Sequence, residues 1–157
     1  MSDLVLIPST DAHFAWMLDE ASAPDGLQRS PGRVDEPWVL KWLRRTLPRL
    51  GGRGGYLMVV DGEVVGMISY KVPPNAEREV EIGYGVAADR RRRGHATRAV
   101  ALLIEAARDD DRVDALVAET TLANLPSQRA LEANGFRQTG RGMDDDEGEV
   151  IVWRLDL

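Results

Sequence analysis

The stretch YGVAADRRRRGHATRAV, residues 84–100, decides how the rest of this sequence is interpreted. The alternation of residues before it predicts a strand that ends at Val86, and a basic loop follows. Gly94 then opens a helix whose apolar residues, from Ala96 to Ala107, recur at helical spacing. Such a junction leaves free backbone N–H groups at the helix N-terminus, where the macrodipole adds about half a positive charge.

These features favour an anion site suited to a pyrophosphate. Gly94 lets a ligand approach the backbone, Ala96 keeps the next turn clear, and the arginines can add bidentate contacts. Four arginines alone would indicate only a solvated charged loop, so the interpretation depends on the flanking strand, glycine and helix. A Walker A loop is excluded because no G-K-[ST] is present. A dinucleotide GxGxxG is absent too, since Gly83 and Gly85 lie within the strand.

The elements on either side of this junction can be predicted in outline. Asp61-Gly62 is a strong hairpin signal. We expect strands at 3–7, 56–60, 63–71, 78–86, 115–118, 136–140 and 149–157. We expect helices at 10–20, from Asp35 to Pro48, from Gly94 onward and at 126–133, and a loop from Ala21 to Asp35. This order predicts an α/β (α+β) sandwich in one domain, residues 1–157. A mostly antiparallel sheet of about seven strands, with one parallel crossover, is flanked by about four helices.

Composition narrows the class of protein. With 43% hydrophobic and 29% charged residues, the 157-residue chain is typical of soluble globular domains. It contains no apolar stretch of the roughly 18–20 residues that a membrane span needs. The N-terminal MSDLVLIPST lacks the pattern of a secretory signal, so we expect a cytoplasmic protein without a membrane partner. The net charge of −6 argues against nucleic acid as the main partner. The absence of cysteine excludes a disulfide framework, a thiolate zinc site and a cysteine nucleophile.

Two separate motifs carry a resemblance to a known family. Residues 91–96, RRRGHA, fit the acetyl-CoA signature Q/R-x-x-G-x-G/A of the GNAT superfamily of N-acetyltransferases. The preceding EIGYGVAADR resembles the fourth strand of the branch that contains the ribosomal-protein N-terminal acetyltransferases. Residues 115–136, ALVAETTLANLPSQRALEANGF, match the A-E/H-T, N-x-x-S and L-E-x-x-G-F pattern of the same branch. The resemblance covers about residues 56–157 and implies a GNAT-like fold.

The resemblance also implies which residues bind acetyl-CoA. The fourth and fifth strands would splay apart around the pantetheine arm, and the N–H of Val86 would bind the thioester carbonyl and stabilise the oxyanion. The other implied cofactor-binding residues are Arg91, Arg92, Arg93, Gly94, His95, Ala96, Thr97, Asn124 and Ser127. Three of them have alternative interpretations: Asn124 could cap the helix at Pro126, Ser127 could simply fill the first turn of that helix, and the His95 side chain is expected to face solvent.

The catalytic residues are implied less uniquely. In other GNAT branches the position of Leu131 holds a tyrosine proposed as general acid. Without that tyrosine, the leaving thiolate would be protonated by Ser127 or by a water, or would leave without a general acid. Glu119, at the end of the fifth strand, is the favoured base for the amine, and Glu81 is its rival. Either glutamate could instead be an ordinary surface carboxylate.

The sequence therefore predicts direct transfer of an acetyl group from acetyl-CoA, without a metal, to a primary amine. The acceptor could be a small molecule or a protein N-terminus, and a homodimer is left open. Three alternatives remain at this point: another acyl donor, a CoA-binding sensor or regulatory module without catalysis, and nucleic-acid binding through the arginines.

Overall fold

The computed structural model describes residues 3–157. Its strands are β1 (Val5–Pro8), β2 (Gln28–Arg29), β3 (Gly55–Val60), β4 (Glu63–Tyr70), β5 (Glu79–Val86), β6 (Ala115–Thr121), β7 (Arg137–Asp144) and β8 (Gly148–Asp156). Its α-helices are α1 (Asp11–Met17), α2 (Pro37–Thr46), α3 (His95–Arg108) and α4 (Leu125–Ala133). Short 3-10 turns lie at Pro24–Gly26, Leu47–Leu50 and Ala88–Arg90. No helix among these residues is both long and apolar enough to span a bilayer.

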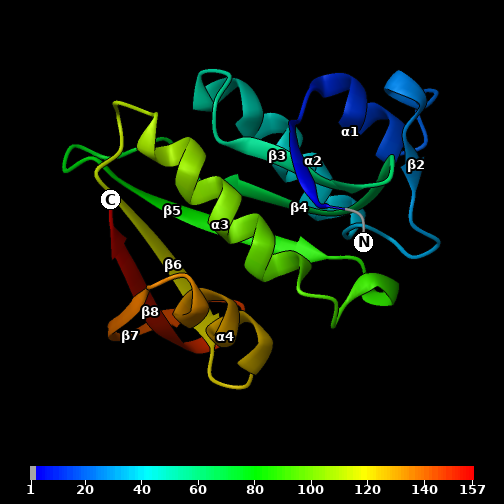
Figure 1. The fold of residues 1–157 in the computed structure, drawn as a ribbon. Helices are drawn as coiled ribbons and strands as arrows, with labels where there is room; N and C mark the ends of the chain where they lie inside the picture. The colour runs from blue at the N-terminus through cyan, green and yellow to red at the C-terminus, as the bar shows by residue number, and fades with distance from the viewer. Residues whose placement is uncertain (1–2) are drawn as a thin grey trace.

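The strands form one sheet in the order β1-β3-β4-β5-β6-β8-β7, with β2 paired to β4 outside this path. The neighbours pair antiparallel, except for β5 with β6 and β2 with β4, which are parallel. The long helix α3 makes the crossover from β5 to β6 and runs across one face of the sheet (Figure 1). The mostly antiparallel α/β sandwich with one such crossover is confirmed.

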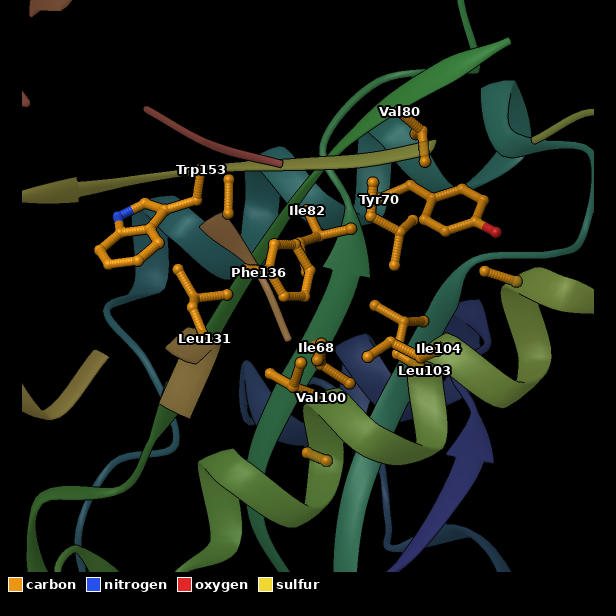
Figure 2. Packing of buried hydrophobic residues seen from close by; sticks show 14 of the residues in the cluster. Ile68, Tyr70, Val80, Ile82, Val100, Leu103, Ile104, Leu131, Phe136 and Trp153 are labelled. Carbon is orange, nitrogen blue, oxygen red and sulfur yellow. The ribbon is translucent and has the colours of Figure 1, made fainter. Parts of the chain in front are cut away.

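The larger core lies between the sheet and the helices α3 and α4 (Figure 2). Val100 and Leu103 of α3 are fully buried against Val80 and Ile82 of β5. Leu131 of α4 belongs to the same cluster and has no exposed surface. Burying a side chain of this size stabilises the fold by about 1.5–3 kcal/mol, so these contacts fix α3 and α4 firmly on the sheet.

A second core lies on the opposite face of the sheet, where α1 and α2 pack. Phe14 and Trp16 of α1 and Leu40 of α2 are buried there against Leu57 and other strand residues. Pro37 is the first residue of α2, where its missing N–H removes no helical hydrogen bond. The sheet thus separates two layers: α3 and α4 on one face, α1 and α2 on the other.

Several predicted boundaries differ from the structure. The helix predicted at 10–20 ends at Met17, because Asp19 adopts the left-handed φ of 63° that turns the chain away. The helix predicted from Asp35 begins at Pro37. The predicted loop 21–35 contains β2, which pairs with β4, so the described residues form eight strands where about seven were expected. β6 continues to Thr121 and β7 to Asp144, farther than predicted. Such pairing depends on distant strands and leaves no local pattern.

Candidate active site

The strands β5 and β6 pair over only a short stretch and then separate. Their register joins Glu79 to Ala115, Val80 to Leu116 and Glu81 to Val117, and no pairing follows. A cavity of about 770 Å³ lies where the strands have diverged, and we call it the first cavity. It is lined by Tyr84, Gly85, Val86, Arg90, Arg91, Arg92, Gly94, His95, Ala96, Thr97, Thr121, Ala123, Asn124, Pro126 and Ser127.

The edge of β5 offers backbone groups to this gap. Ala87 donates its N–H to Val65 of β4 at 2.8 Å, and Lys71 donates its N–H to Glu81 at 2.8 Å. Hydrogen-bonding groups alternate between the two sides of a strand. The N–H groups of Tyr84 and Val86 therefore point away from β4, toward the side where β6 has separated. The predicted role of Val86 requires an N–H on this side.

The N-terminus of α3 opens into the same cavity. The first N–H bonded within the helix is that of Arg98, which donates to Gly94 at 3.0 Å, so the N–H groups of residues 95–97 have no helical acceptor. Gly94 has the left-handed φ of 79°, and a Cβ built on it would meet no atom within 4 Å. Arg92 is also left-handed, with a φ of 64°. Successive N–H groups in such a turn form a concave anion site.

Most of the predicted cofactor-binding residues meet at the first cavity. Val86, Asn124 and Ser127 line it together with the loop and helix residues Arg91, Arg92, Gly94, His95, Ala96 and Thr97. Arg93 is not part of the lining found among the described residues. His95 is half-buried, and this burial lowers the pKa of its imidazole. The positive charges of Arg93 and Arg90 lower that pKa further. Asn124 caps α4 by accepting the N–H of Ser127 at 3.3 Å, which confirms the alternative interpretation without testing a ligand contact.

Ser127 has an unpredicted partner across the cavity. The hydroxyl of Tyr84 on β5 lies 2.7 Å from Ser127 Oγ and 3.2 Å from its carbonyl oxygen. Burial raises the pKa of Tyr84, so the phenol stays neutral. Leu131, at the position where other branches hold a tyrosine, is enclosed in the core and does not line this cavity. A phenol therefore reaches Ser127 from β5 instead of from α4.

The two candidate bases lie on the face of the sheet opposite α3. Glu81 forms an ion pair with Lys71, whose Nζ is 3.0 Å from the carboxylate. Glu119 is exposed on β6. Even there the loss of some hydration raises the pKa of the Glu119 carboxyl group, and the negative charge of Glu81 raises it further. The two glutamates thus lie close enough for the charge of Glu81 to act on Glu119, but neither lines the first cavity.

A second cavity of about 770 Å³ lies among α1, β2 and the start of α2. It is lined by Trp16, Met17, Leu18, Asp19, Glu20, Leu27, Gln28, Arg29, Ser30, Pro31, Gly32, Arg33, Val34, Asp35, Pro37, Leu40 and Lys41. One lining side chain, Asp35, lies close to a residue of the first cavity: a Cβ built on Gly85 would lie 3.7 Å from Asp35 Oδ2. No local pattern could have indicated this, since the position of Asp35 depends on how the loop folds over β5.

The family model for the acetyltransferase (GNAT) domain matches residues 3–137 of this sequence. The chain belongs to the GNAT acetyltransferase family. No curated protein matches the sequence. The solved structures similar to this GNAT acetyltransferase share its fold over almost the whole chain.

The ribosomal L7/L12 alpha-N-protein acetyltransferase RimL, solved with coenzyme A, is 15% identical with a TM-score of 0.75, covering 98% of this chain and 94% of its own. Mycobacterium smegmatis RimJ, solved with CoA-disulfide, is 22% identical with a TM-score of 0.71, covering 98% of this chain and 81% of its own. The aminoglycoside acetyltransferase AAC(6')-Ib, solved with coenzyme A, is 18% identical with a TM-score of 0.71, covering 98% and 95%. At these identities the likeness shows the fold.

Proposed function

We propose that this GNAT acetyltransferase moves an acetyl group from acetyl-CoA directly to a primary amine. The observation that carries the proposal is the first cavity, where the free N–H groups of α3, several arginines and the open edge of β5 face one space. The chain has no cysteine to hold an acetyl group as a thioester, so attack by the amine on the bound donor is the simplest route.

In this proposal each wall of the first cavity has one task. The N–H groups at the start of α3 and the side chains of Arg91 and Arg92 bind the pyrophosphate, since both place positive charge on one side of the space. The N–H groups of Tyr84 and Val86 bind the extended arm and the thioester carbonyl. A fixed N–H aimed at that oxygen stabilises the charge that develops on it during attack.

The class of acceptor is supported by two kinds of relative. The solved structures with this fold include an acetyltransferase of the ribosomal L7/L12 alpha-amino group and an acetyltransferase of aminoglycosides. Both act on amines, one on a protein and one on small molecules. A primary amine is therefore the acceptor that we propose for this chain.

Calorimetric titration of the purified protein with acetyl-CoA tests the donor site. We expect saturable binding that Arg91→Ala weakens by about 10- to 100-fold, the equivalent of one charge-assisted hydrogen bond. Gly94→Trp should abolish it, because a large side chain at this left-handed position would fill the cavity. Arg108→Ala removes the same charge from the far end of α3 and is the matched control. Absence of binding by the unaltered protein at millimolar acetyl-CoA would overturn the proposal.

A further inference from the structure

Within residues 3–157, Asp35 differs from the neighbouring Asp19 and Glu36 in having no cationic partner. Asp19 pairs with Arg29 at 2.8 Å, and Glu36 pairs with Arg33 at 3.2 Å. Asp35 forms no ion pair with any arginine or lysine among the described residues; its Oδ1 accepts only the N–H of Glu36, at 2.8 Å. Its side chain is half-buried, and that burial raises the pKa of the carboxyl group. A carboxylate held in this way can bind a cation supplied by a ligand.

Asp35 lies between the two cavities. Its side chain lines the second cavity, while its Oδ2 lies over Gly85, which lines the first. Glu81, Gly83 and Gly85 share the face of β5 opposite α3, so at Gly85 no side chain separates Asp35 from the strand. The charge of Arg91, on the first cavity, acts on the Asp35 carboxylate and tends to lower its pKa.

The loop that carries Asp35 is also fastened to the arginine loop. Gly32 donates its N–H to Asp89 Oδ2 at 2.9 Å, and a Cβ on Gly32 would lie only 2.7 Å from Asp89 Oδ1. Asp89 belongs to the 3-10 turn Ala88–Arg90, which directly precedes Arg91. This hydrogen bond ties one wall of the second cavity to the turn that precedes the proposed donor site.

We propose that Asp35 holds the ammonium group of a small primary amine, bound as the acceptor in the second cavity, and accepts the proton that the ammonium loses before attack. This inference rests on the proposed function. The volume of the cavity falls within the range of about 300–1,000 Å³ that small-molecule sites occupy, as a small amine requires.

The proton and bond changes balance without another reactant. The ammonium gives one proton to the Asp35 carboxylate, and the free amine forms a C–N bond to the thioester carbonyl carbon. The C–S bond then breaks, and the thiolate takes the second proton lost by the nitrogen. The products are the N-acetylated amine and the free thiol, and Asp35 returns its proton to water.

Thiol release from acetyl-CoA, measured with two simple amines at pH 7, tests the role of Asp35. Propylamine is a cation at this pH and needs both a carboxylate partner and a base, whereas methoxyamine is neutral and needs neither. We expect Asp35→Asn to lower kcat/KM for propylamine by about 100-fold, the usual size of a general-base effect. The kcat/KM for methoxyamine should change by less than about threefold, because this neutral amine needs no general base.

Control variants separate this role from damage to the fold. Glu36→Gln alters the exposed neighbour outside the cavity lining and should leave both amines unaffected, and Asp35→Glu should restore part of the lost activity. Calorimetry should show that Asp35→Asn binds acetyl-CoA as the unaltered protein does. Equal losses with both amines, or no loss with either, would overturn the role of Asp35 while leaving the proposed function intact.

The acceptor class is tested with kanamycin, spermidine and a tripeptide with a free N-terminus. Higher kcat/KM for kanamycin or spermidine than for the tripeptide is the expected result. Preference for the tripeptide would overturn the assignment of a small amine. If the unaltered protein binds acetyl-CoA but releases no thiol with any of the five amines, the proposed function fails and the role of Asp35 fails with it.

Discussion

The hydroxyl of Tyr84 lies 2.7 Å from Ser127 Oγ, and this contact joins β5 to the first turn of α4 across the first cavity. Either oxygen can be the donor. When Tyr84 donates to Ser127, the serine proton is free to point into the cavity, where a departing thiolate could accept a hydrogen bond. When Tyr84 donates to the Ser127 carbonyl at 3.2 Å, the serine proton turns to the phenol. Tyr84 can thus orient the hydroxyl that serves the leaving group.

We expect Tyr84→Phe to lower kcat by about fivefold, the equivalent of one hydrogen bond of about 1 kcal/mol, with little change in KM for acetyl-CoA. The ring and its packing remain, so stability should be almost unchanged. Thiol-release kinetics of Tyr84→Phe, Ser127→Ala and the double variant would check this. Because Tyr84 is expected to act through Ser127, the double variant should be no slower than Ser127→Ala. Additive losses would contradict that order of action.

Glu119→Gln and Glu81→Gln should each lower kcat by less than about tenfold, below the range expected for loss of a general base. The reason is their position, since neither glutamate lines either cavity. Glu81→Gln also removes the partner of Lys71, so Lys71→Met is the control for that effect. A loss of about 100-fold in kcat for Glu119→Gln, with unchanged KM, would show that Glu119 is the base and not Asp35.

We expect Asp110 to make the free energy of unfolding depend on pH. The residue is 4% exposed, and its carboxylate accepts two hydrogen bonds from the Arg112 side chain and one from the Tyr70 hydroxyl. The hydrogen bonds from Arg112 lower the pKa of Asp110 to about 2. A lowered pKa stabilises the fold above the usual pKa of aspartate, and that contribution is lost as the pH falls from about 4 to about 2. We expect Asp110→Asn to reduce the free energy of unfolding at pH 7 by about 2–3 kcal/mol.

Urea unfolding of both proteins between pH 7 and pH 2 would measure this difference. The gap between the unaltered protein and Asp110→Asn should narrow as the pH falls below about 4, where the unfolded carboxyl group becomes protonated. Asp109→Asn, on the exposed neighbour, should show no comparable effect. A gap that stays constant over this range would show that Asp110 acts through packing alone.

The sequence by itself determined the phosphate-binding part of the proposed donor site, because that part is local. The end of β5, the arginines, Gly94 and the first turn of α3 are contiguous, and a strand followed by a glycine and an amphipathic helix fixes where the free N–H groups point. The order of the elements and the hairpin at Asp61-Gly62 were also predictable, since both follow from residue patterns within a few positions. Both residues of that pair have the positive φ that the turn requires.

Only the tertiary structure decided which distant side chains meet that site. Tyr84 and Ser127 are 43 positions apart, and their contact depends on how α4 packs through Leu131. Asp35 reaches Gly85 because the loop before α2 is held by β2 on one side and by Asp89 on the other. Long-range packing and strand pairing set these positions, and neither leaves a periodic pattern in the chain. The phosphate-binding part of the proposed donor site is therefore a property of one segment, whereas the rest of that site and the proposed acceptor site are properties of the folded molecule.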